Sequence, residues 1–381
     1  MSTLRIGLDA RYASDHFPGI GRYTLGLARG LAELESGHTL LLIIDPSADM
    51  QRYDLAALAQ LPNVELVPLA AGPFSLQQQL LMPALVRRMR LDLLHSPYYV
   101  KPYLPLGCPS VVTVYDLFGW RFPRELSRRG RFFYRLTMGL AIRTAAALIT
   151  TSESARADLI HVYRLDPGRV TVTLAAAERR FSPQPPDLVA ALRQRYTLPE
   201  RYVLYLGAQK PHKNLERLLR AWRRLDEAES RAGSLLVIAG HATAHGQQLR
   251  LLAETLGLSA TVRFLPNVAD ADLPALYSGA ELFVFPSYYE GFGLPPLEAM
   301  ACGTPVLCAY ATSLPEVVGN AAMTFDPYNV IELAESLARL LNNPSLRRDL
   351  SARGRRRARD FSWRRTAMGT LPIYERLAGL G

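Results

Sequence analysis

Two carboxylates, Glu290 and Glu298, stand eight positions apart on either side of a glycine-containing loop. A short apolar run at 282–285 precedes them and predicts a strand. Pro295 and Pro296 can start a helix, with Glu298 in its first turn. Ligands of open α/β sheets bind at the edge where the strands end. Because a carboxylate there can accept two hydrogen bonds from a ribose diol, the segment predicts a site for a nucleotide or a sugar.

The same segment offers backbone groups that suit an anion. Exposed amides at Phe292, Gly293 and Leu294 can hold phosphate or sugar hydroxyls. The alternative is that Glu298 only complements the helix dipole and that Glu290 is solvated. The whole string, 286–306, favours the binding site.

A second candidate loop, 207–215, follows a buried strand and opens a helix. It holds Lys210, His212 and Lys213, and Asn214 is the expected N-cap. Cations at a helix N-terminus oppose the helix dipole, so this cluster indicates a bound anion. A solvated basic loop is the alternative.

Gly19 and Gly21 lie between a predicted strand at 4–8 and a predicted helix at 23–34. Glycine lets a backbone approach a ligand, and the start of a helix favours phosphate. The spacing is not the dinucleotide fingerprint G-x-G-x-x-G, because Thr24 stands at the third position after Gly21. A plain tight turn is the alternative.

Strand-like and helix-like segments alternate along the chain, which predicts an α/β fold with doubly wound parallel sheets. Further predicted strands lie at 40–44, 111–114, 147–150, 202–206, 235–238 and 261–264, and further helices begin at 215 and near 248. Three prolines in 181–187 mark a domain boundary. We therefore expect two α/β domains with a ligand-binding cleft between them.

Composition limits the class of protein. The chain has 381 residues, of which 49% are hydrophobic and 20% charged, and this excludes a disordered or fibrous protein. The charges sum to 44 − 34 = +10, which predicts an anionic partner: a nucleotide, a nucleic acid or an anionic membrane. The sequence contains no recognisable motif of a nucleic-acid-binding module, so no nucleic acid partner is expected.

Cysteine usage and the lack of long apolar runs indicate where the protein works. The three cysteines match no zinc or redox spacing, which predicts a reduced, cytoplasmic protein. No stretch approaches the ~20 apolar residues that span a bilayer. The segment 128–135, RRGRFFYR, is a candidate peripheral contact with an anionic membrane. A solvated helix with a buried aromatic side is the alternative.

The string from Glu290 to Glu298 resembles the E-x7-E motif of retaining glycosyltransferases of family 4, which have the GT-B fold. YLGAQKPHKNLERLLRAW resembles that family's first donor-domain strand and helix, and SLPEVVGNAA, FDP and DFSWRRTA resemble its later segments. HSPYYVKP at 95–102 and VVTVYDL at 111–117 resemble its acceptor domain. The resemblance covers nearly the whole chain and is greatest to the mannosyltransferase-like branch.

The resemblance implies two Rossmann-like domains: an acceptor domain at 1–183 and a donor domain at 184–362, with a helix at 363–381 packing back toward the first. It implies a retaining, metal-independent hexosyltransferase with no cofactor besides its nucleotide-sugar co-substrate. The expected donor is GDP-mannose, and the acceptor is a hydroxyl of a glycan or lipid-linked glycan. Alternatives are UDP-sugars of glucose, galactose or N-acetylhexosamine, or a GT-B-shaped epimerase.

The resemblance also implies roles for single residues. Gly19 and Gly21 approach the donor diphosphate, and Lys213 neutralises it in place of a metal ion. Glu298 holds the ribose hydroxyls. Glu290 and the loop amides after it hold the donor sugar.

The chain departs from the family pattern at two places. Where relatives have His-Asp near the reacting centre, this chain has Tyr115 and Asp116, and we expect both at the catalytic site. Many relatives have an arginine in the donor loop, where this chain has Ala208 or His212. Diphosphate binding is therefore expected to depend mainly on Lys213, with help from Lys210 or His212.

Two further features carry open or competing interpretations. Asp270-Ala-Asp272 has the D-x-D form of metal-dependent enzymes, but helical spacing after it favours an N-cap. His95 is either a base in the acceptor site or a satisfied loop histidine.

Overall fold

A computed structural model describes residues 3–14, 17–47, 55–61, 63–241 and 243–380. The chain divides into two compact units. Unit 1 comprises Met1–Ala176 with Phe361–Gly381, and unit 2 comprises Ala177–Asp360. The sequence placed these boundaries at 183/184 and 362/363.

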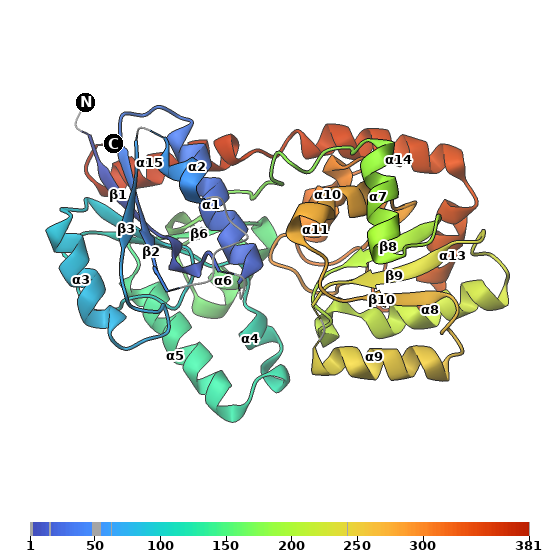
Figure 1. The fold of residues 1–381 in the computed structure, drawn as a ribbon. Coiled ribbons are helices and arrows are strands. Elements are labelled where there is room, and N and C mark those ends of the chain that lie inside the picture. The colour runs from blue at the N-terminus through green and yellow to red at the C-terminus, as the bar shows by residue number, and fades with distance from the viewer. Residues whose placement is uncertain (1–2, 15–16, 48–54, 62, 242, 381) are drawn as a thin grey trace. The chain divides into compact units, whose positions relative to one another are not determined.

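Unit 1 is built on a parallel sheet of seven strands in the order β3-β2-β1-β4-β5-β6-β7 (Figure 1). Its strands are β1 (Arg5–Asp9), β2 (Thr39–Ile44), β3 (Val64–Pro68), β4 (Leu93–Ser96), β5 (Ser110–Thr113), β6 (Ala147–Thr150) and β7 (Val170–Val172). Its helices are α1 (Pro18–Ala32), α2 (Leu55–Ala59), α3 (Gln78–Arg88), α4 (Phe118–Arg121), α5 (Arg128–Thr144), α6 (Glu153–Tyr163) and α15 (Trp363–Leu377). The short 3-10 helices are η1 (Ala10–Tyr12), η2 (Pro123–Glu125) and η3 (Pro167–Arg169).

Unit 2 repeats the design with six strands in the order β10-β9-β8-β11-β12-β13. Its strands are β8 (Tyr202–Leu206), β9 (Leu235–Ala239), β10 (Val262–Leu265), β11 (Leu282–Phe285), β12 (Val306–Ala309) and β13 (Met323–Phe325). Its helices are α7 (Pro186–Tyr196), α8 (Leu215–Glu227), α9 (Ala244–Thr255), α10 (Leu273–Ser278), α11 (Leu294–Ala301), α12 (Leu314–Val318), α13 (Val330–Leu341) and α14 (Pro344–Ala358), with 3-10 helices η4 (Pro211–Lys213) and η5 (Asp270–Asp272). Figure 1 shows α8 and α9 on one face of the sheet and α7, α10 and α11 on the other.

Strand order reverses at the centre of the sheet in unit 2. Chain order runs one way from β8 to β10 and the other way from β11 to β13, so β8 and β11 are neighbours, with Leu282 paired to Val203. In doubly wound sheets, the loops after two such strands diverge and leave room for a ligand. The loop after β8 carries Lys213 and the loop after β11 carries Glu290. The topology therefore brings the two predicted loops to one place.

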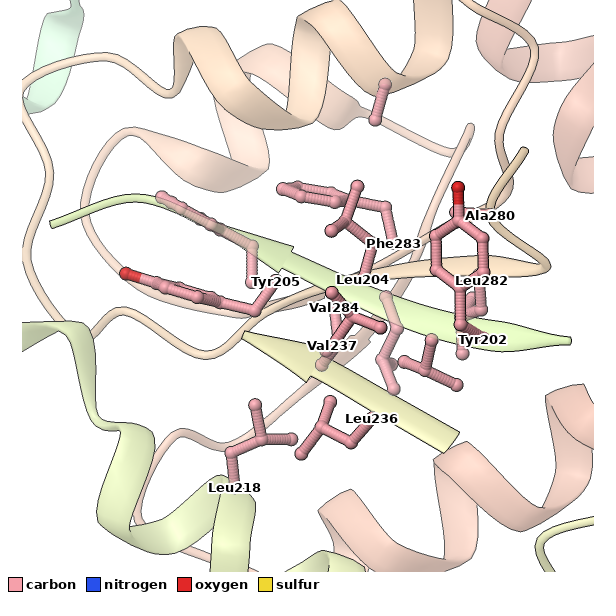
Figure 2. Close-up of a cluster of buried hydrophobic side chains, with 14 of the residues drawn as sticks. Tyr202, Leu204, Tyr205, Leu218, Leu236, Val237, Ala280, Leu282, Phe283 and Val284 are labelled. Carbon is pink, nitrogen blue, oxygen red and sulfur yellow. The ribbon is translucent and has the colours of Figure 1, made fainter. Parts of the chain in front are cut away.

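The central strands are apolar on both faces because helices cover both. All four residues of β11 are buried, and Tyr205, Leu236 and Leu218 pack around them (Figure 2). Burial on both faces explains why these strands appear in the sequence as continuous apolar runs.

Helix α15 packs on α1 within unit 1, and Figure 1 shows the two side by side. Two glycines of α1 make this close approach possible. A Cβ at Gly30 would lie 2.1 Å from the carbonyl oxygen of Trp363, and one at Gly26 would lie 2.2 Å from the Trp363 ring.

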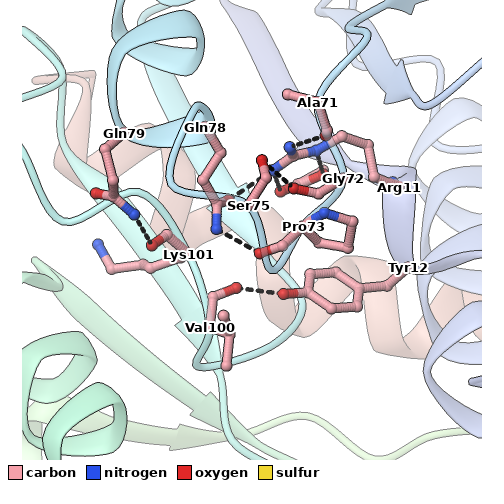
Figure 3. Close-up of polar contacts among 11 residues, drawn as sticks. Arg11, Tyr12, Ala71, Gly72, Pro73, Ser75, Gln78, Gln79, Val100 and Lys101 are labelled. Atoms are coloured by element: carbon pink, nitrogen blue, oxygen red, sulfur yellow. Dashed lines mark hydrogen bonds and ion pairs between the residues drawn. The ribbon is translucent and has the colours of Figure 1, made fainter. Parts of the chain in front are cut away.

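A buried ion pair fixes the loops at the end of β1. The guanidinium of Arg11 donates to both carboxylate oxygens of Asp9 at 2.8 and 2.7 Å, and both side chains are fully buried. Arg11 also donates to the carbonyl of Ala71 at 2.7 Å and to Oε1 of Gln78 at 3.0 Å (Figure 3). Arg11 thus ties the 71–78 segment to the carboxyl end of β1.

Candidate active site

Lys213 and Glu290 form an ion pair in unit 2, with 2.5 Å between Nζ and Oε1. Their side chains are 16% and 14% exposed, and the ammonium also lies 5.4 Å from the centre of the Phe285 ring. Lys213 belongs to η4 and not to the first turn of α8. The pair therefore stands at the end of β8 and β11, largely shielded from bulk water.

Asn214 joins the two loops; it stands at the N-cap position of α8, as predicted, but it does not cap the helix through its side chain. Its backbone is left-handed, at φ 62°, and its side chain makes no capping bond to α8. The amide instead donates to the carbonyl of Pro286 at 3.0 Å and to that of Pro327 at 2.8 Å. Asn214 thereby fixes the Lys213 turn against the loops after β11 and β13.

His212 supports the site through its backbone and carries no positive charge at neutral pH. Burial, and secondarily the charges of Lys213 and Lys210, lower its pKa to about 3. Its carbonyl accepts hydrogen bonds from the amide of Tyr288 and from Oγ of Ser287. The cations of this loop that can meet an anion are therefore its two lysines.

Helix α11 begins next to Glu290 with free backbone donors. Within the described part of the chain, the amides of Gly293 and Leu294 have no hydrogen-bond acceptor, and Pro295 and Pro296 have no amide hydrogen. Gly293 is required here: its φ is 127°, and a Cβ would lie 2.9 Å from Leu314. Two open N–H groups at a helix start are suited to a phosphate or a sugar oxygen.

Two hydroxyl residues hold the Glu290 loop, and sequence analysis assigned them no role. Thr312 Oγ1 accepts from the amide of Glu290 at 3.0 Å. Ser313 Oγ lies within hydrogen-bond distance of the carbonyl oxygens of Glu290 and Phe292, at 3.0 and 2.6 Å, and can donate its one proton to either. Both follow β12: Ser313 is the first residue of the segment SLPEVVGNAA, and Thr312 directly precedes it. From the sequence, this segment indicates only a resemblance to the family. The carbonyl of Phe292 is thus occupied in holding its own loop.

Glu298 lies deeper than predicted. It falls after the first turn of α11, which contains no acidic residue, and is 1% exposed. Its Oε2 accepts a hydrogen bond from the Tyr277 hydroxyl at 2.9 Å. The carboxylate is therefore fixed in a buried position by a neighbouring helix.

Gly19 and Gly21 belong to unit 1, and they do not precede a helix as predicted. Helix α1 begins at Pro18, so both lie in its first turn, and the amide of Gly21 donates to the carbonyl of Phe17 at 2.9 Å. Apart from its own helix backbone and chain neighbours, no atom of the described residues lies within 4 Å of a Cβ placed on Gly19. Packing therefore gives no reason for a glycine at position 19.

Tyr115 and Asp116 follow β5, also in unit 1. Burial raises the pKa of Tyr115 well above 10, and its ring packs edge-on against Tyr23 at 5.3 Å. Its hydroxyl is buried without a hydrogen-bond partner among the residues that the structure describes. Asp116 Oδ1 accepts from the amide of Phe118 at 2.8 Å. Tyr115 therefore stays protonated at neutral pH and can donate one hydrogen bond.

His95 is a satisfied core residue, in a strand and not in a loop. It lies in β4 with no exposed surface, and burial lowers its pKa to about 3. Nδ1 lies 2.5 Å from the Tyr374 hydroxyl and Nε2 lies 2.8 Å from Thr113 Oγ1. Both ring nitrogens are occupied, which excludes it as a base in an acceptor site.

Of Asp270 and Asp272, only Asp272 stands at a predicted N-cap position, that of α10. They form η5, and neither side chain makes a capping bond. Asp270 pairs with Arg180, and Asp272 accepts from Arg195 and Tyr196. Across the described ranges, no group of three or more His, Cys, Asp or Glu side chains is arranged to hold a metal ion.

Helix α5 exposes most of the aromatic side chains that the alternative interpretation of 128–135 would bury. Phe132 and Phe133 are 70% and 46% exposed, as is Leu136 at 47%, beside exposed Arg128 and Arg129. The aromatic side of 128–135 is thus largely outside the core, and only Tyr134 is buried. Within the described residues, no helix combines the length and apolar character that crossing a bilayer requires.

Comparison with known proteins decides the family. A model described as Glycosyltransferase Family 4 matches residues 18–174, and one described as Glycosyl transferases group 1 matches residues 191–357. The chain is 31% identical to O-antigen chain mannosyltransferase B of Escherichia coli, over 94% of this chain and 96% of the relative. The chain belongs to glycosyltransferase family 4.

Other members of this enzyme class agree in length and fold. The present chain is 29% identical to an MMP alpha-(1->4)-mannosyltransferase of Mycolicibacterium hassiacum, over 98% of both chains. A sucrose-phosphate synthase from Thermosynechococcus elongatus has the same fold, with a TM-score of 0.77, 22% identity and coverage of 99% and 100%. With two Rossmann-like units, this glycosyltransferase has the GT-B fold.

Proposed function

We propose that this enzyme transfers a mannosyl group from GDP-mannose to a hydroxyl of a glycan or lipid-linked glycan, with retention of configuration. Support for mannose comes from the relatives, which are mannosyltransferases in Escherichia coli and Mycolicibacterium hassiacum. Support for a nucleotide-diphosphate donor comes from the Lys213–Glu290 pair beside the open amides of α11. That pair is the observation on which the proposal chiefly rests.

In this proposal the ion pair exchanges partners when the donor binds. The diphosphate takes the Lys213 ammonium and the free amides of Gly293 and Leu294, and Glu290 is released to accept a hydrogen bond from a donor-sugar hydroxyl. The exchange preserves a partner for each charge, which avoids a buried unpaired ion. Glu298 accepts from the ribose diol while Tyr277 holds its other side.

The chemistry then depends on charge at the leaving group. As the glycosidic bond breaks, negative charge gathers on the β-phosphate, and Lys213 with the α11 amides stabilises it. Retention follows if the acceptor hydroxyl attacks from the face that the phosphate leaves, with a phosphate oxygen taking its proton. Lys213 and the helix start supply the positive charge that a metal ion would supply, so transfer should survive excess EDTA.

The acceptor is proposed to be presented at a membrane surface by α5. Exposed Phe132, Phe133 and Leu136 can enter the interfacial region, and Arg128 and Arg129 beside them suit anionic headgroups. The protein's net charge of +10 adds to this attraction.

The test is a thermal-shift panel of nucleotide sugars followed by product analysis. Free donor at ~100 times its Kd stabilises the folded protein by about 2.7 kcal/mol. We expect GDP-mannose to give the largest shift and a new glycoside to form only when an acceptor is present. A larger shift with a UDP-sugar would show that the donor is that UDP-sugar and not GDP-mannose. Conversion of the sugar without an acceptor would indicate an epimerase.

A further inference from the structure

A hollow of about 320 Å³ lies at the carboxyl edge of the unit 2 sheet. Its lining residues are Tyr310, Thr324, Phe325, Asp326 and Glu332. Tyr310 directly follows β12, and Asp326 directly follows β13. A hollow of this size, with aromatic and polar walls, falls in the range that small ligands use.

The hollow is structurally connected to the candidate active site. Tyr310 belongs to the same loop as Thr312 and Ser313, whose hydroxyls hold the Glu290 loop. The amide of Tyr310 donates to the carbonyl of Phe325 at 2.8 Å, which fixes its backbone to β13. A ligand in the hollow would therefore lie beside the predicted donor loop, on a rigid part of the same unit.

Tyr310 presents an open ring. It is 68% exposed, and among the described residues its ring stacks on no aromatic or cation and its hydroxyl makes no hydrogen bond. The nearby Tyr328 differs, because it stacks with Tyr288 at 6.1 Å and lies under the guanidinium of Arg217 at 5.3 Å. The ring of Tyr310 is thus available to a flat, partly apolar face.

The two carboxylates on the hollow can accept hydrogen bonds from a ligand. Asp326 Oδ1 accepts from the amide of Tyr328 at 2.9 Å, and Glu332 Oε2 accepts from the amide of Asp326 at 3.2 Å. Within the described ranges, Asp326 Oδ2 and Glu332 Oε1 have no donor. Because ionised carboxylates only accept, they favour hydroxyl groups and repel phosphate.

These features together suit a neutral sugar, and we propose that the hollow is a second carbohydrate site, which binds a sugar unit of a neutral glycan. The C–H face of the sugar packs on Tyr310, and two of its hydroxyls donate to Asp326 and Glu332. The identity of the glycan as acceptor or product rests on the proposed function. Two carboxylates are too few for a protein-built calcium site, which takes six to eight oxygens.

The test measures binding of a linear mannotetraose to the full chain without nucleotide, by calorimetry and saturation-transfer NMR. We expect Tyr310→Ala to weaken binding roughly three- to tenfold, which is the contribution of one aromatic contact to affinity. Tyr310→Phe should bind as tightly as the wild type does. Glu332→Gln should also weaken binding. Leu251→Ala, which removes a side chain 64% exposed on α9, is the matched control and should bind as the wild type does.

Several outcomes overturn the inference: no binding by the wild type at millimolar glycan, equal binding by Tyr310→Ala, or displacement of the glycan by GDP, which would place it in the donor site. Transfer to a monosaccharide acceptor is measured separately. If the wild type transfers no sugar but binding depends on Tyr310, only the proposed function fails. If transfer proceeds and Tyr310→Ala leaves glycan binding unchanged, only the proposal of a second site is wrong.

Discussion

At the scale of single residues, the Lys213–Glu290 pair neutralises one of the two charged lysines of the loop after β8 from within the protein. The carboxylate neutralises the ammonium in the absence of donor, and a diphosphate can replace it. The pair thus holds each side chain near its proposed working position. Replacement of either partner should affect both the resting charge balance and the reaction.

Lys213→Met should lower kcat by about 10²–10³, because it removes a charge that acts on the leaving group and keeps an unbranched side chain of similar length. Steady-state kinetics and a melting curve are the measurements. Lys210→Met, at an exposed position of the same loop, is the control and should lose much less. A Lys213→Met enzyme with more than about a tenth of the wild-type kcat would place the phosphate site elsewhere.

Glu298→Gln should weaken nucleotide binding by about 1.5–3 kcal/mol, because a charge-assisted bond to the ribose is lost. Calorimetry with GDP measures this. Tyr277→Phe is the matched variant, since it removes the hydroxyl that holds Glu298 and leaves the carboxylate. If both variants lose affinity equally, Glu298 acts through packing and not through contact with the nucleotide.

His95 should make the protein sensitive to acid. Its pKa is lowered from 6.5 to about 3 by burial, so the unfolded state binds more protons than the native state between these values. The free energy of unfolding therefore falls as the pH drops through that window. Urea unfolding at pH 7 and pH 5 should show that the wild type loses about 2 kcal/mol more than His95→Gln. Equal losses would show that burial does not lower the pKa of His95 in the native state.

At the scale of elements, continuous apolar runs were the most reliable signal. The predicted strands at 147–150, 202–206 and 282–285 coincide with β6, β8 and β11, which are almost entirely apolar because helices cover both faces. Strand β4 has two polar residues in four, and β13 has only three residues, so neither forms a run. Both escaped prediction for this reason.

Sequence analysis could propose site residues where the residue type alone indicates the chemistry. Glu290, Lys213 and the α11 amides carry charge or free donors, and their loops follow recognisable strands. No role could be assigned to Thr312 and Ser313 from the sequence, because their hydroxyls bond to the Glu290 loop, which only folding brings close to them. The buried positions of Glu298 and His95 depend equally on helices distant in the sequence, α10 and α15.

Gly30→Ala should destabilise the protein by roughly 1–3 kcal/mol, because its Cβ would meet the backbone of Trp363 and force α15 away from α1. Denaturant unfolding measures this. Gly19→Ala, in the open first turn of the same helix, is the control and should leave stability unchanged or slightly raised. A loss of donor affinity in Gly19→Ala with normal stability would support its proposed approach to the diphosphate.

At the scale of the whole molecule, the charge of +10 and the exposed side of α5 should act together on a membrane. Partition to anionic vesicles should fall as salt rises, and Phe132→Ser with Phe133→Ser should weaken it further. Vesicle sedimentation is the measurement, and Leu251→Ser is the control. Equal partition to neutral and anionic vesicles would contradict the electrostatic part, and no partition at low salt would indicate a soluble acceptor.

The return of α15 to unit 1 makes unit 2 an insertion between the parts of unit 1. Consider a chain emerging from the ribosome. Unit 2 has all its residues once Asp360 is made, but unit 1 still lacks the helix that covers Gly26 and Gly30 and supplies Tyr374 to His95. The domain that starts first is therefore completed last. During synthesis, the side of α1 that carries Gly26 and Gly30 is the surface that a chaperone would have to protect.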